Sequence, residues 1–209
     1  MIKIEGVEVL QLFASPFASH SWPDSDELNK ELRQRILAYE REHPARGISK
    51  SNIGGWHSEA GQLQFCGEAA KTLIERMLAL ANEVTARTLA GRAVPSFTWW
   101  LEAWANVNRV GDFNRMHSHG LSTWSGTYYV DDGEPPASDE FGTALEIYDP
   151  SAERATVFFP QILPPGLFIR PRPGLMVLFP GYVPHMVMPH RGKRPRISIA
   201  FNLRKMPFP

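Results

Sequence analysis

The sequence predicts a mainly β fold with flanking helices, arranged as a jelly roll. The chain after residue 94 consists of short runs of β-branched and aromatic residues separated by Pro, Gly and Asp. Of the 18 prolines in the whole sequence, 14 lie at or beyond Pro135. Two amphipathic segments precede this region. About eight short strands with long connections favour a jelly roll over other all-β folds.

The two amphipathic segments predict helices that support the β region from outside. In residues 25–42 the apolar side chains form one stripe, capping residue types open the segment, and Pro44 follows its end. Residues 68–89 keep a helical spacing of apolar side chains, and Gly91 stands where a helix would end.

The candidate strands share a high content of β-branched and aromatic residues, and turn residues lie between them. They are Phe97 to Asn108, Ser122 to Val130, Ala144 to Tyr148, Thr156 to Phe159, Leu167 to Arg170, Leu175 to Phe179, Met186 to Met188 and Arg196 to Leu203.

The length of 209 residues is enough for one substantial core, and two unrelated domains would be a tight fit. We therefore expect residues 1–209 to form a single domain. Residues 1–93 would supply an N-terminal strand and the two supporting helices, and residues 94–209 would form the jelly-roll core.

Composition excludes several classes of partner and location. Lys and Arg number 22 and Asp and Glu number 22, so the formal net charge is zero and neither nucleic acid nor an anionic membrane is an expected partner. The single cysteine, Cys66, cannot close an intramolecular disulfide and favours a reducing compartment. No signal-peptide pattern and no apolar run long enough to span a membrane stand out, so we expect a cytoplasmic protein. An apolar patch on the helices could support a homodimer.

The densest group of chemically active residues lies between Gly111 and Gly120. If this stretch is extended, His117 and His119 point to the same face and Ser118 points away, which would supply half of a metal site. His185 follows a strongly apolar strand and a Pro/Gly turn, and it is the candidate for a third ligand. Three imidazoles would suit Fe, Zn, Cu or Ni.

The last candidate strand places an arginine and a hydroxyl on one face of an otherwise apolar segment. Period-two alternation puts Arg196 and Ser198 on the same side, and the isoleucines between and after them on the other. An inward guanidinium requires an anion, and a guanidinium beside a hydroxyl is a good receptor for a carboxylate. An arginine that faces solvent or pairs with Asp or Glu is the alternative.

The order of these features resembles that of the Fe(II)- and 2-oxoglutarate-dependent oxygenases, and more closely that of a small bacterial family related to prolyl 4-hydroxylases. That pattern comprises His-x-Asp/Glu, a distal His and, about ten residues further on, Arg-x-Ser. The matching segments cover most of the chain from Ser51 onward. They are SNIGGWHS (51–58), WANVN (104–108), MHSHG (116–120), SGTYYV (125–130), EIYDP (146–150), FPGYVPHMV (179–187) and RISIAFN (196–202).

The resemblance implies that residues 94–209 form a double-stranded β-helix, the cupin-like form of the jelly roll. It also implies a dioxygenase, an oxidoreductase that uses iron, 2-oxoglutarate and O2. It would convert 2-oxoglutarate to succinate and CO2 while it hydroxylates an unactivated C–H bond of a small-molecule or peptidyl substrate. The implied metal ligands are His117, His119 and His185, of which His117 and His185, with Arg196, are also the implied catalytic residues.

The resemblance also implies a binding place for the far carboxylate of 2-oxoglutarate. Arg196 and Ser198 would bind it together with a hydroxyl, for which Tyr129 is the candidate because Tyr129 and Thr127 share the face of the metal motif while Tyr128 points away. Asn108 would touch the co-substrate.

Three further residues are candidates for contact with the substrate. Asn106 precedes the metal motif on a neighbouring strand, and Trp56 and His57 lie in a Gly-rich segment that could form a lid. Four tryptophans are candidates for the cavity wall, although core packing explains most of them. They are Trp99, Trp100, Trp104 and Trp124.

One departure from the family pattern concerns the second ligand, where His119 replaces the usual carboxylate. A neutral imidazole there makes the site more positive by about one charge. The chain therefore has a three-His site, or only one of His117 and His119 binds metal. A carboxylate recruited from elsewhere is a further alternative, with Asp112, Glu146 and Asp149 as the candidates.

Two other functions compete with the oxygenase. A cupin-type metalloenzyme would need no co-substrate, but the Glu expected after the His motif is absent between Gly120 and Trp124, and Arg196 and Ser198 have no role in it. A non-catalytic jelly-roll binding module would leave the His cluster incidental.

Overall fold

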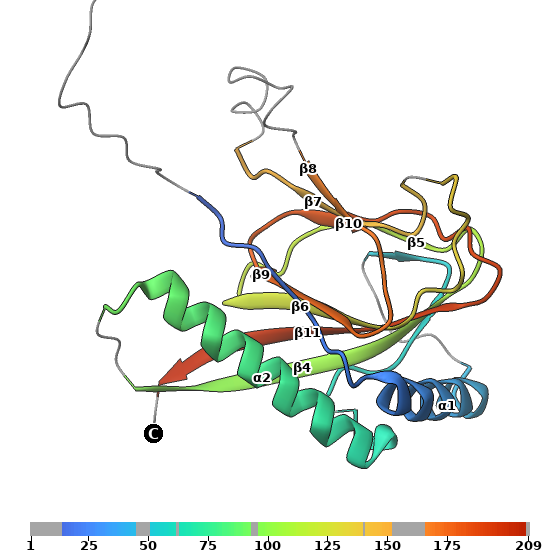
Figure 1. The fold of residues 1–209 in the computed structure, drawn as a ribbon, viewed down its shortest axis with the longest axis horizontal. Helices are drawn as coiled ribbons and strands as arrows, with labels where there is room; N and C mark the ends of the chain where they lie inside the picture. The colour runs from blue at the N-terminus through green and yellow to red at the C-terminus, as the bar shows by residue number, and fades with distance from the viewer. Residues whose placement is uncertain are drawn as a thin grey trace, which may run out of the picture.

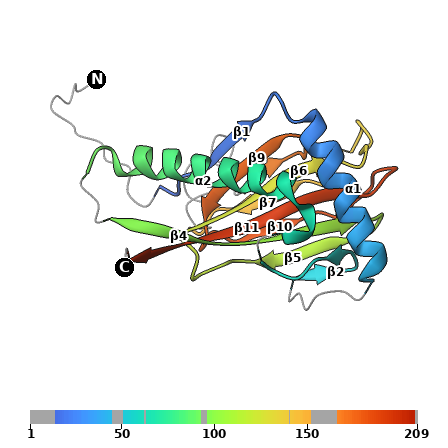
Figure 2. The same ribbon diagram turned by 90° about the horizontal axis from the view of Figure 1, so that it is seen from below.

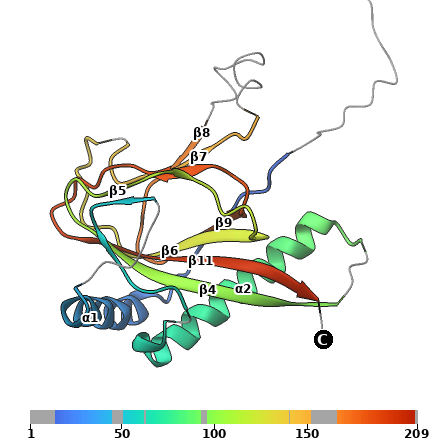
Figure 3. The same cartoon turned by 180° about the vertical axis from the view of Figure 1, so that it is seen from behind.

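A computed structural model describes residues 14–44, 51–61, 63–92, 96–139, 141–151 and 166–207. Two antiparallel sheets lie one above the other as layers, and the helices lie on the outer side of the larger sheet (Figure 1 and Figure 3). The predicted fold class, a mainly β jelly roll with flanking helices, is confirmed.

The larger sheet has the strand order β1-β9-β6-β11-β4-β3. Its strands are β1 (Ala18–Ser21), β3 (Trp56–His57), β4 (Phe97–Asn108), β6 (Trp124–Asp131), β9 (Leu175–Pro180) and β11 (Arg196–Pro207). The smaller sheet has the order β2-β5-β10-β7-β8. Its strands are β2 (Asn52–Ile53), β5 (Phe113–His117), β7 (Leu145–Tyr148), β8 (Gly166–Ile169) and β10 (His185–Val187).

Two long helices cover the outer face of the larger sheet, α1 (Asp26–Glu42) and α2 (Glu68–Leu89), and the short 3-10 helix η1 (Gln64–Cys66) precedes α2 (Figure 2). Their apolar stripes meet the apolar face of β4 and β11 in one core. Fully buried members of this core are Leu32, Ile36, Leu73, Met77, Ala81, Ala103, Ala105, Val107, Ile197, Ile199, Phe201 and Leu203. The helices therefore fix the larger sheet from outside and leave its inner face free for a site.

Period-two alternation assigns the two faces of β11. Ile197, Ile199 and Phe201 enter the core under the helices, whereas Arg196 and Ser198 face the space between the sheets. A second core cluster joins the two sheets on that inner side, and its buried members are Leu145, Ile147, Val177, Phe179 and Val183.

Both predicted helices and the long strands agree with the structure within a few residues, and β4 has the predicted bounds. The very short strands β2 and β3 were not predicted, because two residues carry no alternation of their own and depend on pairing with neighbours. The candidate strand Thr156 to Phe159 lies outside the described residues. No helix among those described is long and apolar enough to cross a membrane.

Candidate active site

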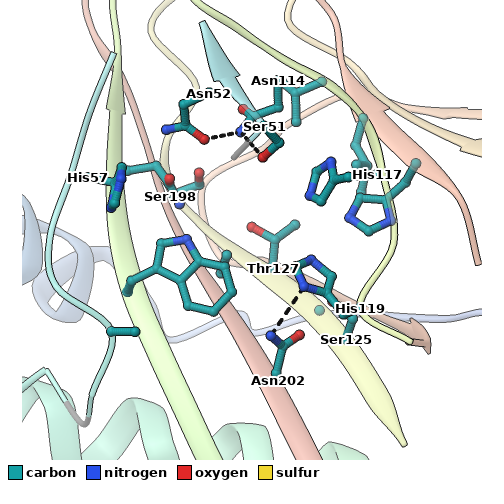
Figure 4. Close-up of a pocket in the computed structure, with 18 of the residues that line it drawn as sticks. Ser51, Asn52, His57, Asn114, His117, His119, Ser125, Thr127, Ser198 and Asn202 are labelled. Atoms are coloured by element: carbon teal, nitrogen blue, oxygen red, sulfur yellow. Dashed lines mark hydrogen bonds between the residues drawn. The ribbon is translucent and has the colours of Figure 1, made fainter. Parts of the chain in front are cut away.

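A cavity of about 1110 Å³ lies between the two sheets, and both sheets contribute to its wall (Figure 4). The inner face of the larger sheet forms the floor of this cavity, and cross-strand pairing arranges the side chains of that face in rows. His57, Asn106, Ser198 and Tyr129 are successive partners across β3, β4, β11 and β6. All four line the cavity.

Two further rows follow along the same strands. Trp104, Ala200 and Thr127 form the next one, and Glu102, Asn202 and Ser125 form the one after it. The register of three neighbouring strands thus turns side chains from distant parts of the sequence into one polar surface.

Three histidines converge above this floor. His117 ends β5 and His185 begins β10, and the two are cross-strand partners. His119 lies two residues beyond β5, and its backbone N–H donates to the carbonyl oxygen of Gly181 over 2.6 Å. One nitrogen from each imidazole lies within 4.8 Å of the others, so the three side chains could hold one metal ion.

The strand containing the His-x-His motif is shorter than the extended stretch considered from the sequence. β5 ends at His117, so His119 reaches the cluster from a turn, and Ser118 lines the cavity as well instead of pointing away. The bond from His119 to Gly181 replaces strand pairing as the feature that holds His119 in place.

Backbone carbonyl groups fix two of the imidazoles. His117 Nδ1 lies 2.8 Å from the carbonyl oxygen of Arg115, and His185 Nδ1 lies 2.9 Å from that of Val183. A carbonyl oxygen only accepts, so each Nδ1 carries the proton and each Nε2 presents a lone pair. This is the form in which an imidazole binds a metal.

Burial keeps the cluster uncharged. It lowers the pKa of His185 to about 3 and that of His119 to about 4, and His117 adds to both shifts by repulsion. Burial also lowers the pKa of His117, against the effect of its bond to the carbonyl of Arg115. At neutral pH all three are neutral, as metal ligands must be.

The structure brings none of the three candidate carboxylates into this cluster. The Asp112 side chain accepts from the backbone N–H of Arg109, Glu146 contacts Tyr148, and Asp149 accepts from the backbone of Ser151. Among the described residues the acidic side chains in the cavity wall are Glu59 and Glu102, and neither joins the metal-ligand group. The group of described residues that could hold a metal therefore contains three histidines and none of these carboxylates.

Arg196 lies at the other end of the cavity and is 3% exposed. Its Nη1 donates to the carbonyl oxygen of Thr143 over 3.2 Å and its Nη2 to Asn108 Oδ1 over 3.1 Å, while Nε has no partner. Within the described part of the chain no carboxylate forms a salt bridge with it. A buried guanidinium held by neutral acceptors carries an uncompensated charge, so this end of the cavity is suited to an anion.

Tyr129 shares this end of the cavity and is 1% exposed. Burial raises its pKa to about 12, although the charge of Arg196 opposes that shift, and burial lowers the pKa of Arg196. The phenol therefore stays protonated and can donate to an anion next to Arg196. Tyr128 points into the opposite layer, where its hydroxyl donates to Asn29 Oδ1, as alternation predicted.

Eight of the ten site residues predicted from the sequence line this one cavity. They are His57, Asn106, His117, His119, Tyr129, His185, Arg196 and Ser198. Trp104 is also in the wall, with its ring centroid 6.0 Å from that of His119.

Two predicted site residues lie elsewhere. Trp56 is in the core and donates from its indole to the carbonyl oxygen of His43, because Trp56 and His57 form β3 instead of a lid. Asn108 is outside the cavity wall and acts on Arg196 as an acceptor.

Sequence reasoning missed several polar groups of the cavity, among them Asn114 and Asn202. Asn114 contacts Ser51 and Asn52 where β5 pairs with β2, and this contact depends on a strand too short to predict. Asn202 shares the cavity face of Arg196, Ser198 and Ala200, so extending the period-two pattern of β11 by one step would have found it.

These features define a double-stranded β-helix protein with a cluster of metal-ligand type and a buried anion receptor in one cavity. Residues 102–202 match the sequence profile of a family described as "Putative 2OG-Fe(II) oxygenase". The predicted resemblance is thereby confirmed: this region of the chain is similar to the 2OG-Fe(II) oxygenases. The match includes every residue of the His cluster and the anion receptor.

Solved structures share the fold. A prolyl-4-hydroxylase from Pseudomonas putida is 18% identical over 92% of this chain and 94% of its own, with a TM-score of 0.60. A prolyl hydroxylase from Trichoplax adhaerens, solved with a peptide of hypoxia inducible factor, is 17% identical over 90% and 83%, with a TM-score of 0.62. The carbocyclase SnoK of nogalamycin biosynthesis is 13% identical over 90% and 79%, with a TM-score of 0.60. No curated protein sequence matches the chain.

Proposed function

We propose that the protein is an Fe(II)- and 2-oxoglutarate-dependent dioxygenase that hydroxylates an unactivated C–H bond and forms succinate and CO2. One observation carries the proposal: a His cluster and a buried, charge-uncompensated arginine occupy opposite ends of a single cavity. A dicarboxylate that binds a metal in the His cluster through one carboxylate and the guanidinium of Arg196 through the other accounts for both features of the cavity.

In this proposal His117, His119 and His185 hold Fe(II). The metal, once bound with 2-oxoglutarate and O2, supplies the oxidising chemistry of the family. The three neutral imidazoles leave the full charge of the metal in place, and Arg196 adds another positive charge. The cavity therefore attracts the doubly negative co-substrate more strongly than a site with a carboxylate ligand would.

The remaining residues bind and orient. Arg196 and Tyr129 receive the far carboxylate, Ser198 lies beside them on the floor, and Asn108 holds the guanidinium in plane. Buried apolar side chains from both sheets, Leu145 and Phe179, close the wall behind His185 and exclude water. A cupin-type enzyme without a co-substrate would leave Arg196 buried with no anion to bind.

The substrate, in this proposal, is a small molecule or a peptidyl group that enters the wide part of the cavity beside Asn106 and His57. The peptide in the Trichoplax adhaerens structure supports a peptidyl substrate as one of these two classes. The chain acts as a single domain in the cytoplasm, where the buried Cys66, whose pKa burial raises to about 12, stays reduced. A homodimer is compatible with this proposal.

The first experiment adds Fe(II) and then 2-oxoglutarate to metal-free protein without oxygen and follows the visible charge-transfer band of a chelated keto acid. We expect a band only with both additions. Arg196→Met should weaken 2-oxoglutarate binding by about 100-fold, the cost of removing one member of a buried charged pair, and should leave Fe(II) binding unchanged.

The matched control is Arg191→Met, which makes the same substitution at an exposed arginine and should leave the band unchanged. Iron binding without any band would contradict the co-substrate role and favour a cupin-type enzyme. A lack of iron binding would overturn the proposed metal site.

A further inference from the structure

His119 differs from the other two histidines in the partner of its Nδ1 atom. That atom lies 3.3 Å from the side-chain amide of Asn202 (Figure 4). The Nδ1 atoms of His117 and His185 face backbone carbonyl groups instead. Asn202 is 5% exposed, and the other atom of its amide, Oδ1, is buried without a partner.

The orientation of this amide decides whether His119 can bind a metal through Nε2. With Nδ2 toward the ring, the amide donates to Nδ1, and the single proton of the neutral imidazole then occupies Nε2. With Oδ1 toward the ring, Nδ1 donates and Nε2 presents its lone pair. The two orientations differ by a half-turn that exchanges atoms of nearly equal size.

We propose that Asn202 is a positioning residue whose Oδ1 accepts the Nδ1 proton of His119 and so makes Nε2 of His119 the third metal ligand. The inference rests on the proposed function, because it is the metal that requires the lone pair. All three imidazoles then have the same state, with Nδ1 bonded to an oxygen and Nε2 free.

The fold holds both partners rigidly. Asn202 lies within β11, paired on one side with Glu102 of β4 and on the other with Ser125 of β6. The backbone N–H of His119 bonds to Gly181, and its carbonyl oxygen accepts from Ser122 over 2.7 Å. A fixed acceptor that faces a fixed ring selects one tautomer and one ring orientation.

This placement also connects the two ends of the cavity. Arg196 and Asn202 lie on the same face of one strand, six residues apart, and both line the cavity. A single strand therefore contains both the anion receptor and the residue that contacts the third ligand.

The tautomer can be measured without any metal. Two-bond ¹H–¹⁵N NMR of the metal-free protein should show His119 protonated on Nδ1, and Asn202→Asp, which keeps an acceptor and removes the donor, should keep that state. Asn202→Ala should shift the ring toward Nε2 protonation. Nε2 protonation in the wild type would overturn the inference whatever the protein binds.

Metal affinity provides the second readout, with Co(II) as the probe and its visible absorption as the signal. Asn202→Ala should weaken Co(II) binding by about 10- to 100-fold, the usual effect of removing a partner that orients a ligand. Asn202→Asp should restore wild-type affinity or better. Asn82→Ala makes the same substitution at an exposed position of α2, outside the cavity, and should leave the affinity unchanged.

The outcomes separate the inference from the proposed function. In a His119→Ala background, Asn202→Ala should cause no additional loss of Co(II) affinity. Wild-type affinity in Asn202→Ala, with Co(II) bound, would overturn the role of Asn202 and leave the metal site in place. Failure of the wild type to bind Co(II) would overturn the metal site and the inference with it.

Discussion

Tyr129 and Tyr128 are neighbours in β6 whose hydroxyl groups serve different purposes. Tyr129 faces the cavity beside Arg196, and Tyr128 faces α1, where it donates to Asn29 Oδ1 over 2.7 Å. Replacing either tyrosine by phenylalanine therefore removes a hydroxyl group from one face of β6 and leaves the other face unchanged.

Tyr129→Phe should weaken 2-oxoglutarate binding to the Fe(II)-loaded protein by about 10- to 150-fold, since a hydrogen bond to a charged group contributes about 1.5–3 kcal/mol. Tyr128→Phe should leave that affinity unchanged and lower the free energy of unfolding by about 1 kcal/mol. Anaerobic calorimetry and urea unfolding measure the two quantities. Equal 2-oxoglutarate affinity in the wild type and Tyr129→Phe would exclude Tyr129 from the carboxylate site.

At the residue scale, the sequence predicts the residue types of the site better than their contacts. His117, His185 and Arg196 follow from motif spacing and alternation. The bonds from Asn108 to Arg196 and from Asn202 to His119 join positions 88 and 83 residues apart, and they depend on a strand register that no local pattern encodes. Trp56 was misassigned because pairing with β4 draws its segment into the sheet and its ring into the core.

At the scale of elements, Asp131 connects α1 to the segments that lead into and out of the site. This residue ends β6 and is 6% exposed. Its Oδ2 accepts from Arg33 of α1 over 2.9 Å and from Arg194, two residues before Arg196, over 3.2 Å. Its Oδ1 accepts from the backbone N–H of Gly133.

Asp131→Asn should lower the free energy of unfolding by about 2 kcal/mol, less than for a fully buried pair because both arginines are half-exposed. It should also weaken 2-oxoglutarate binding, since the start of β11 loses a contact that fixes it. Urea unfolding and calorimetry measure the two effects. Glu27→Gln, at an exposed ion pair, should change neither, and an unchanged stability in Asp131→Asn would contradict this role.

The elements that the sequence predicts well are those that bury a long apolar stripe. β4 and β11 show twelve residues each of sustained pattern, and α1 and α2 repeat their spacing over several turns. The strands β2 and β3 contain two residues each, and their conformation results from the partners beside them. The sequence pattern shows which face of a long element packs against the core. A short edge strand shows no such pattern, because it forms only when the neighbouring strand is in place.

At the scale of the whole molecule, the His cluster lies in the cavity between the two sheets, where burial disfavours protonated imidazoles. His119 and His185 have pKa values of about 4 and 3 in the folded protein, and histidine in an unfolded chain has a pKa of about 6.5. Above pH 6.5 both states are neutral. Below it the unfolded chain binds protons that the folded protein does not, so acid favours unfolding.

The free energy of unfolding of the metal-free protein should therefore fall as the pH decreases from 6.5 toward 4, with each histidine contributing up to about 1.4 kcal/mol per pH unit. Urea unfolding with a chelator at pH 7.5, 6.5 and 5.5 measures this slope. His185→Gln should reduce it, and His20→Gln, at an exposed position of β1, should not. The same slope in His185→Gln as in the wild type would show that this histidine is not the group that titrates.

The central claim is that one cavity holds a metal on three histidines and the far carboxylate of 2-oxoglutarate on Arg196 and Tyr129. An anaerobic crystal structure with Mn(II) in place of Fe(II) and with 2-oxoglutarate tests it most directly, because anomalous scattering locates the metal independently of the protein coordinates. We expect one Mn(II) bound by His117, His119 and His185, and the far carboxylate paired with Arg196. A metal bound away from these histidines, or a co-substrate whose far carboxylate does not reach Arg196, would contradict the account.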